Sequence, residues 1–335
     1  MLRNALQSLK TINGGKEHDE NQYIHLIKDI LKEGEMICGR NGNAKTIYGS
    51  SMHFSLQNGT LPLLTTKKVA WKTCLRELLW FIQGSTNNDL LQEQKVTIWN
   101  GNASKEFLES RGLSHYREND LGPVYGHQWR HFNAPYTTCD DDYSGKGVDQ
   151  LQYIIDQLKD KEGRHSRRLV MTAWNPCQLD EMALPPCHIL SQFHVSNDNK
   201  LSCSLYQRSG DVGLGVPFNI ASYSFLTHLI AHHCGLEAHE FIYHLGNAHI
   251  YDDHLDALKS QVDRIPFDFP TLTITRAAAA AGAGSSAAGA GSSAAAAGAG
   301  AGSSAAAASI NDYKVDDFIV SDYKSHEPIK MLMRN

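Results

Sequence analysis

The sequence predicts an α+β fold. Apolar residues recur at helical spacing in the segments 22–31, 71–83, 149–159, 220–233 and 252–262. Runs typical of strands occupy 46–56, 169–174, 191–195 and 201–207, and 241–249 fits a strand or a loop. The two kinds of segment do not alternate regularly. This irregular order favours an α+β fold over a doubly wound parallel sheet.

The composition is that of a globular protein with a sizeable core. The chain has 335 residues, of which 41% are apolar and 20% charged. Its net charge of −5 argues against a non-specific nucleic-acid binder, although a local arginine cluster could still hold a phosphate. No run approaches the roughly 20 apolar residues that a membrane-spanning helix needs. The seven cysteines include no pair at zinc-ligand spacing, so we expect no metal site, no disulfide framework and a reducing compartment.

We expect one domain over 21–335, preceded by a flexible tail at 1–20 and interrupted by an insert at 277–308. The insert contains only Ala, Gly and Ser, and such a tract cannot bury enough apolar surface to offset its ordering entropy. Sequence typical of a folded domain resumes at Ile310 and continues to Asn335. Residues 1–16 carry three basic residues and no acid. The expected location is the cytoplasm or nucleus, with mitochondrial import left open.

Cys187 is a candidate nucleophile within the stretch ALPPCHILSQF at 183–193. Two preceding prolines fix the direction of the backbone, and a nearby imidazole or cation raises the thiolate fraction of a cysteine. The same motif also fits a buried structural cysteine beside a turn. It fits equally a cysteine hydrolase in which a distant histidine acts as the base. The motif alone leaves these alternatives open.

A second stretch, LYQRSGDVGLGVPFN at 205–219, gathers many groups that bind ligands. Arg208 and Ser209 suit a phosphate, and Asn219 can read the polar edge of a base. Three glycines allow the backbone to approach a ligand closely. This density of ligand-type groups is difficult to explain as a polar turn.

Four arginines and one glutamate complete the candidates that the residues themselves suggest. Together with Arg208, the side chains of Arg40, Arg167 and Arg168 are enough for a dianionic phosphate. Glu77 lies within an apolar helical segment. Burial there would raise its pKa and suit the carboxyl group to proton transfer.

Eight blocks of the sequence together resemble the thymidylate synthase family. They are LLTTKK (63–68), ELLWF (77–81), LGPVYG followed by QWR (121–130), SRR (166–168), MALPPCH (182–188), YQRSGD (206–211), GVPFNIASY (215–223) and AHIY (248–251). The resemblance covers about 22–270 and continues at 310–333, and 101–119 is similar to an insertion of the eukaryotic members. It implies a large mixed β-sheet flanked by helices, with two such sheets packed back to back in a homodimer.

The resemblance also implies a reaction. It is the reductive methylation of dUMP to dTMP, a methyl transfer of nucleotide biosynthesis, with 5,10-methylenetetrahydrofolate as co-substrate and dihydrofolate as second product. Cys187 would attack C6 of the uracil, which divides one difficult step into easier ones. Glu77 would organise proton transfers, and Tyr125 would lie near the abstracted proton. His188 would contribute hydrogen bonding.

The remaining site residues are carried over from the matching motifs. The catalytic set is Cys187, Glu77, Tyr125, His188, Arg208 and Asn219. The residues expected on dUMP are Arg40, Arg167, Arg168, Arg208, Ser209, Asp211, Asn219, His249 and Tyr251, with Arg167 and Arg168 reaching the partner's site. The residues expected on the folate are Ile98, Trp99, Asp211, Leu214, Gly215 and Phe218, beneath a C-terminal lid.

The chain departs from the family pattern at several positions. Asn100 and Asn247 replace aspartates, Asp253 replaces an asparagine, and the chain ends in Met-Arg-Asn instead of a small apolar pair. These departures bear on cofactor affinity and turnover.

Three rivals remain: a pyrimidine hydroxymethylase on the same fold, an inactive homologue that only binds, and a cysteine hydrolase. Asn219 argues for uracil over cytosine, and Trp99 fits the members that transfer a hydride.

Overall fold

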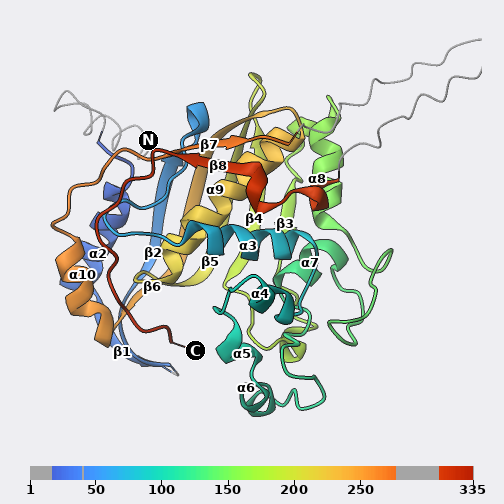
Figure 1. Ribbon diagram of the computed structural model, residues 1–335, viewed down its shortest axis with the longest axis horizontal. Helices are drawn as coiled ribbons and strands as arrows, with labels where there is room; N and C mark the ends of the chain where they lie inside the picture. Colours follow the sequence, from blue (N-terminus) through green and yellow to red (C-terminus); the bar gives the residue numbers. More distant parts are fainter. Residues whose placement is uncertain (1–16, 40, 277–308, 335) are drawn as a thin grey trace, which may run out of the picture.

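The computed structural model describes residues 17–39, 41–276 and 309–334 (Figure 1). Within them the main sheet has six strands in the order β1-β2-β6-β5-β4-β3. The strands are β1 (Glu35–Gly39), β2 (Gly42–Ser55), β3 (Val170–Thr172), β4 (His188–Val195), β5 (Lys200–Asp211) and β6 (Glu237–Tyr251). Strands β5 and β6 run parallel and every other neighbouring pair is antiparallel, so the sheet is mixed, as expected.

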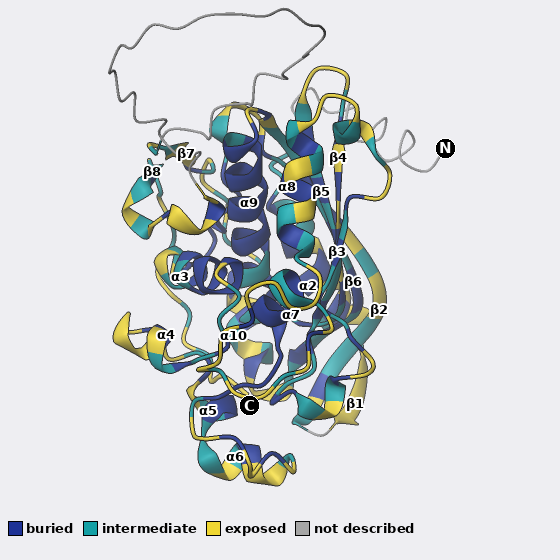
Figure 2. Cartoon of the chain, turned by 90° about the vertical axis from the view of Figure 1, so that its right-hand side faces the viewer, coloured by how far each residue is buried: buried dark blue, intermediate teal, exposed yellow. Residues whose placement is uncertain are grey.

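A long helix, α9 (Gly215–His233), connects the two parallel strands and forms the centre of the core. It is apolar on all sides, which is typical of a fully buried helix. One of its sides packs on β5 and β6, and another on α3 (Trp71–Ile82). Figures 1 and 2 show α9 and α3 on the same side of the sheet. The strands point Leu205, Phe241 and Tyr243 toward these helices.

The other helices surround this core. They are α2 (Asn21–Glu33), α4 (Asp89–Glu93), α5 (Asn100–Ala103), α6 (Lys105–Ser110), α7 (Tyr125–His131), α8 (Gln150–Lys159) and α10 (Leu255–Gln261). Short 3₁₀ turns are η1 (Gln57–Gly59), η2 (Gly163–His165), η3 (Leu179–Glu181), η4 (Asp252–His254), η5 (Ile310–Asp312) and η6 (Val315–Asp317). A small second sheet pairs β7 (Thr271–Ile274) with β8 (Phe318–Ser321), and so joins the segments on either side of 277–308.

The face of the main sheet that points away from α9 is open in the single chain (Figure 2). Burial alternates along β5, where Leu205 and Gln207 are buried and Tyr206 between them is 40% exposed. Tyr48 on β2 is 81% exposed. This alternation is typical of a sheet with one face in the core.

The folded part begins earlier than the expected tail at 1–20 allows. Of that tail the structure describes 17–20, and Glu20 is fully buried. Its carboxylate accepts hydrogen bonds from the backbone N–H and the hydroxyl groups of Thr65 and Thr66, at 2.6–3.0 Å. These bonds compensate for the desolvation of the charge. The rest of the tail and the expected insert at 277–308 lie outside the described residues.

Candidate active site

The backbone of Cys187 is held from two sides. Cys187 immediately precedes β4, and its N–H donates to the hydroxyl of Tyr125 at 2.8 Å. Its carbonyl accepts from the backbone N–H of Arg208 on β5 at 3.0 Å. Two elements distant in sequence, the start of α7 and the end of β5, therefore fix the backbone of Cys187.

Gly122 brings the loop before α7 close to this position. Its φ of +72° is rarely adopted by other residues, and a Cβ there would lie 2.1 Å from the carbonyl oxygen of Glu181. The neighbouring Leu121 carbonyl accepts from the N–H of Ala183 at 3.0 Å. The loop therefore packs directly on the segment that leads to Cys187, and this contact places Tyr125 beside it.

The two prolines of the motif anchor the guanidinium group of Arg208. Nε donates to the carbonyl of Pro186 at 2.9 Å, and Nη2 donates to that of Pro185 at 2.8 Å. The guanidinium carbon lies 5.7 Å from the ring centre of Trp174. Prolines lack a backbone N–H but retain the carbonyl acceptor, so this pair supplies two acceptors to a cation beside the thiol.

Burial and charge act in opposite directions on the thiol of Cys187. Burial raises its pKa above the ordinary value, whereas the Arg208 charge and a hydrogen bond to Tyr125 lower it. The effect of Arg208 has the direction expected from the sequence, but burial outweighs it. In the absence of a ligand the thiol form is therefore favoured at neutral pH.

Glu77 is a buried carboxyl group with a single hydrogen-bond donor shown, Trp99. Nε1 of Trp99 donates to Oε1 of Glu77 at 2.7 Å. Burial raises the pKa of Glu77 to about 7, and this hydrogen bond opposes the rise. The ring of Tyr125 lies edge-on to Trp99, with centroids 6.0 Å apart. A carboxyl group with a pKa near 7 can both accept and donate a proton at neutral pH.

His188 is buried and neutral. Burial lowers its pKa to about 4, and its side chain is hydrogen-bonded to Asn219. Its ring lies between Tyr125 and Tyr223, at centroid distances of 5.2 and 5.3 Å. A neutral imidazole at this position can orient Asn219, and the hydrogen-bonding role expected for it in the reaction stays a prediction.

Two residues that sequence reasoning missed, Gln207 and Tyr243, orient the amide group of Asn219. Nε2 of Gln207 donates to Oδ1 of Asn219 at 3.0 Å. The hydroxyl of Tyr243 donates to Oε1 of Gln207 at 2.6 Å and lies 3.4 Å from the same Oδ1. The only available signal was the strand alternation, which places Gln207 on the buried face next to Arg208.

The parallel pairing of β5 and β6 brings the residues expected to bind the sugar close to those expected to bind the phosphate. Asp211 pairs with His249, and Ser209 pairs with Asn247. Nδ1 of His249 lies 3.0 Å from Oδ1 of Asn247, and its ring centre lies 5.2 Å from that of Tyr251. The ends of both strands therefore present their polar groups at one edge of the sheet.

Asp211 and the buried Lys67 hold the turn between β5 and α9. Oδ1 of Asp211 accepts from the N–H of Gly213 at 2.8 Å, and Nζ of Lys67 donates to the carbonyl of Gly213. Burial lowers the pKa of Lys67 to about 8, although the charges of Asp211 and Glu20 oppose this. Lys67 belongs to the LLTTKK block, but nothing in the sequence alone indicates this role for it.

Arg167 and Arg168 are not brought to Cys187 within the chain. Both are exposed and lie just before β3, at the edge of the sheet farthest from β1. Arg40 lies outside the described residues. The phosphate candidates that the structure groups near the nucleophile are thus Arg208 and Ser209.

The expected folate residues form a partly exposed apolar set. Ile98, Leu214, Gly215 and Phe218 are half-buried, whereas Trp99 is buried through its bond to Glu77. Oδ1 of Asn100, one of the departures from the family pattern, accepts from Asn88 and Gln92 at 3.1 Å each. Asn100 therefore stabilises the loop that carries Trp99.

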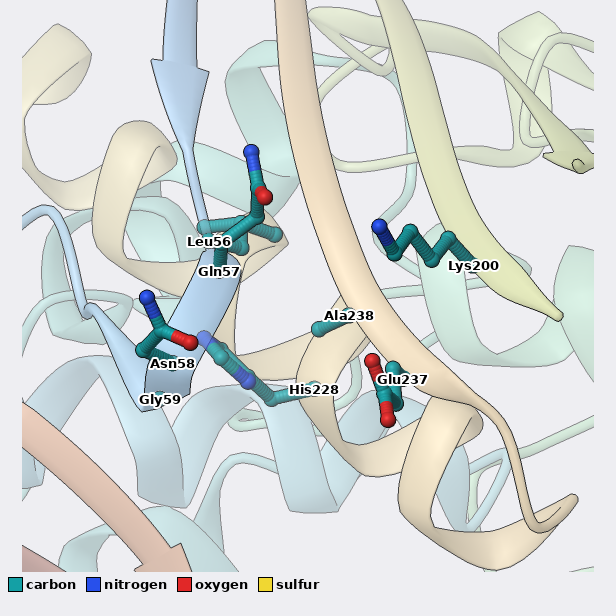
Figure 3. Close-up of a pocket in the computed structure, with 8 residues that line it drawn as sticks. All are labelled: Leu56, Gln57, Asn58, Gly59, Lys200, His228, Glu237 and Ala238. Carbon is teal, nitrogen blue, oxygen red and sulfur yellow. The ribbon is translucent and has the colours of Figure 1, made fainter. Parts of the chain in front are cut away.

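A cavity of about 360 Å³ lies at the opposite end of the strands, and Figure 3 shows its lining. Lys200, at the start of β5, and His228 of α9 contribute to it, and none of the expected site residues does.

Over the described ranges, no group of three His, Cys, Asp or Glu side chains could hold a metal ion. In the same ranges no helix is long and apolar enough to cross a membrane.

Comparison with known proteins gives one consistent family. The family model described as thymidylate synthase matches residues 21–335. The chain is 46% identical to the thymidylate synthase of Saccharomyces cerevisiae (strain ATCC 204508 / S288c), over 95% of this chain and 98% of the yeast protein.

Other relatives are longer than this chain. The probable thymidylate synthase of Schizosaccharomyces pombe is 48% identical over 94% of this chain and 47% of its own length. The bifunctional dihydrofolate reductase-thymidylate synthase of Leishmania major is 46% identical over 95% of this chain and 56% of its own length. The chain thus spans about half the length of these two curated relatives.

Proposed function

Because the chain belongs to the thymidylate synthase family, we propose that it converts dUMP to dTMP with 5,10-methylenetetrahydrofolate as methyl donor and reductant. The observation that carries this proposal is the position of Cys187. Its backbone is held by Tyr125 and Arg208, and Tyr125 also interacts electrostatically with Glu77, a buried carboxyl group of pKa about 7. The second product is dihydrofolate.

Cys187 is the proposed nucleophile. Its sulfur adds to C6 of the uracil, which converts the C5–C6 double bond into an enolate that can attack the methylene carbon of the co-substrate. The thiol pKa is raised by burial, so the thiolate must be favoured when substrate binds. Arg208 supplies the positive charge that favours it. Elimination at the end of the reaction restores the thiol.

Glu77 is the proposed proton-transfer group, and Tyr125 is proposed to assist it by hydrogen bonding. The C5 proton must leave before the methylene group can be reduced, and a carboxylate with a pKa near 7 is suited to accept it directly or through water. The hydroxyl of Tyr125 lies at the Cys187 backbone, and burial raises its pKa well above the ordinary value. Tyr125 therefore stays protonated and acts as a hydrogen-bonding group near C5. His188, being neutral, orients Asn219.

The proposed nucleotide site follows the ends of β5 and β6. Arg208 and Ser209 bind the phosphate together with Arg40 and, from the partner subunit of a homodimer, residues equivalent to Arg167 and Arg168. His249 and Tyr251 hold the sugar, Asp211 lies between nucleotide and folate, and Asn219 reads the uracil edge. Ile98, Trp99, Leu214, Gly215 and Phe218 form the folate surface.

The proposed homodimer uses the open face of the main sheet. Tyr48 and Tyr206 are exposed there, on the face opposite to α9. Arg167 and Arg168 are exposed at the sheet edge, which fits a role in the partner's site. We further propose a single catalytic domain over 21–335 that is interrupted by the insert at 277–308, and a cytoplasmic location.

The proposed function is tested by turnover. Purified protein is mixed with dUMP and methylenetetrahydrofolate, and dihydrofolate formation is followed by absorbance. We expect turnover in the parent, none in Cys187→Ala, and unchanged turnover in Cys177→Ala, which alters an exposed free cysteine. A folded parent that binds dUMP but forms no dihydrofolate would overturn the proposal. Formation of 5-hydroxymethyl-dUMP instead would assign the chain to the hydroxymethylase alternative.

A further inference from the structure

The segment 331–334 lies against the edge of the candidate site. The sulfur of Met331 is 3.1 Å from the point where a Cβ of Gly213 would stand. Nε2 of His254 donates to the carbonyl oxygen of Leu332 at 2.8 Å. Nδ1 of the same imidazole lies 3.8 Å from Oδ1 of Asp211. The segment is thus connected, through one buried histidine, to the turn that follows β5.

Arg334 of this segment and two aspartates of the turn η4, Asp252 and Asp253, form a cluster of charged side chains that we call the latch. Nη2 of Arg334 is 2.9 Å from Oδ2 of Asp253 and 3.4 Å from Oδ1 of Asp252. The guanidinium carbon lies 5.6 Å from the ring centre of Tyr251. The side chains of the latch are each between 34% and 41% exposed, so salt can screen them.

Two of the three latch residues, Asp253 and Arg334, stand at positions named above as departures from the family pattern that the resemblance implies. The resemblance implies an asparagine at position 253 and a small apolar pair at the end, whereas this chain has Asp253 and Arg334. One departure adds a negative charge and the other adds a positive charge. In the structure the two face each other at ion-pair distance. The negative charge of Asp253 thus has an oppositely charged partner in Arg334.

We propose that Asp252, Asp253 and Arg334 form an ionic latch that holds the segment 331–334 over Tyr251. Arg334 is then a positioning residue: it covers the face of Tyr251 and keeps the Leu332 carbonyl on His254. An attraction between a guanidinium group and an aromatic ring adds to the two ion pairs. The latch preorganises the sugar side of the nucleotide site, and this consequence rests on the proposed function.

The closed segment can be tested without catalysis. Endoproteinase Lys-C cuts after the exposed Lys330, and intact-mass analysis detects the loss of residues 331–335. We expect Arg334→Asp to be cut about fivefold faster than the parent, because an exposed ion pair contributes at most about that factor. The double variant Asp253→Arg with Arg334→Asp restores the attraction and returns cleavage toward the parent rate. Added salt accelerates cleavage of the parent but not of Arg334→Asp.

A matched control reverses another exposed ion pair nearby. Lys259 and Asp256 on α10 are 2.9 Å apart and are highly exposed. Lys259→Asp makes the same change of charge without touching the latch, so cleavage after Lys330 should stay at the parent rate. Equal cleavage of parent and Arg334→Asp, or failure of the double variant to restore protection, would overturn the latch.

Kinetics then separate the latch from the proposed function. We expect Arg334→Asp to raise the KM for dUMP about fivefold with little change in kcat, and the double variant to reverse this. Calorimetric titration with dUMP alone should show the same weakening. Protection from Lys-C that depends on the latch, in a protein without turnover, would support the latch and refute the synthase activity. Turnover in the parent, with a KM and a cleavage rate that Arg334→Asp leaves unchanged, would support the synthase activity and refute the latch.

Discussion

Replacement of Glu77 by glutamine should stabilise the protein at the pH where the enzyme is expected to work. Glu77 is buried, its pKa is raised from the ordinary 4.5 to about 7, and its only hydrogen bond shown in the structure comes from Trp99. Between these two pKa values the folded state binds a proton that the unfolded state has released. The contribution of Glu77 to stability is therefore most favourable at acidic pH and falls as the pH rises through the interval.

The magnitude follows from the size of the pKa change. Each pKa unit corresponds to about 1.4 kcal/mol, so ionisation of the buried carboxyl costs about 3 kcal/mol of the free energy of unfolding above pH 7. Glutamine has nearly the same shape, keeps an acceptor for Trp99 and cannot ionise. Relative to the parent, Glu77→Gln should therefore gain about 3 kcal/mol between about pH 5 and pH 8.

The assay is urea unfolding of parent and Glu77→Gln at several pH values and one protein concentration. Exposed Glu93→Gln serves as the control, because its stability should follow that of the parent at every pH. Turnover should be lost in Glu77→Gln if the carboxylate transfers protons. If the free energies of unfolding of the parent and Glu77→Gln instead change in parallel from pH 5 to 8, the claim that Glu77 is a buried carboxyl group with a raised pKa is refuted.

Three further substitutions test separate parts of the site and fold. Arg208→Leu removes the cation beside Cys187, so alkylation of that thiol by iodoacetamide at about pH 8 should slow by severalfold, and an unchanged rate would contradict the role of Arg208. Tyr243→Phe removes the hydroxyl that holds Gln207 and Asn219, so the affinity for dUMP, measured by calorimetry, should fall about fivefold while the fold is retained. Equal affinity in Tyr243→Phe and the parent would contradict this role. Glu20→Ala leaves the Thr65 and Thr66 donors without their buried acceptor, and urea unfolding should show a loss of about 2–4 kcal/mol; a loss below about 0.5 kcal/mol would indicate that the N-terminal anchor is dispensable.

The parts of the structure that the sequence predicted are those with local signals. The expected helix at 71–83 is α3, because its apolar residues recur at helical spacing. The expected strand at 46–56 is β2, in which the buried Met52 and Phe54 alternate with His53 and Ser55. The helices α4, α5 and α6 were not predicted. They contain only four to six residues, too few to show a period, and tertiary contacts hold them.

Two predicted segment boundaries differ from the structure, and at both of them polar residues belong to folded elements. The stretch 215–219 was interpreted as part of a polar segment between two apolar elements, yet it forms the first turn of α9 and carries Asn219 on a helix. Glu20 was placed in a tail because it follows a run of charged residues. In the structure its partners, Thr65 and Thr66, lie 45 positions away or more. No pattern within either segment contains that information.

The site itself depends on one non-local feature, the parallel alignment of β5 and β6 within an otherwise antiparallel sheet. Parallel neighbours need a long crossover, and α9 provides it. This β5-α9-β6 unit makes both strands end at the same edge, where binding sites of parallel sheets commonly lie. An antiparallel pair would have placed Arg208 and His249 at opposite ends of the sheet. The nucleophile motif and the AHIY block therefore form one site only because a helix that is apolar on every side returns the chain in the same direction.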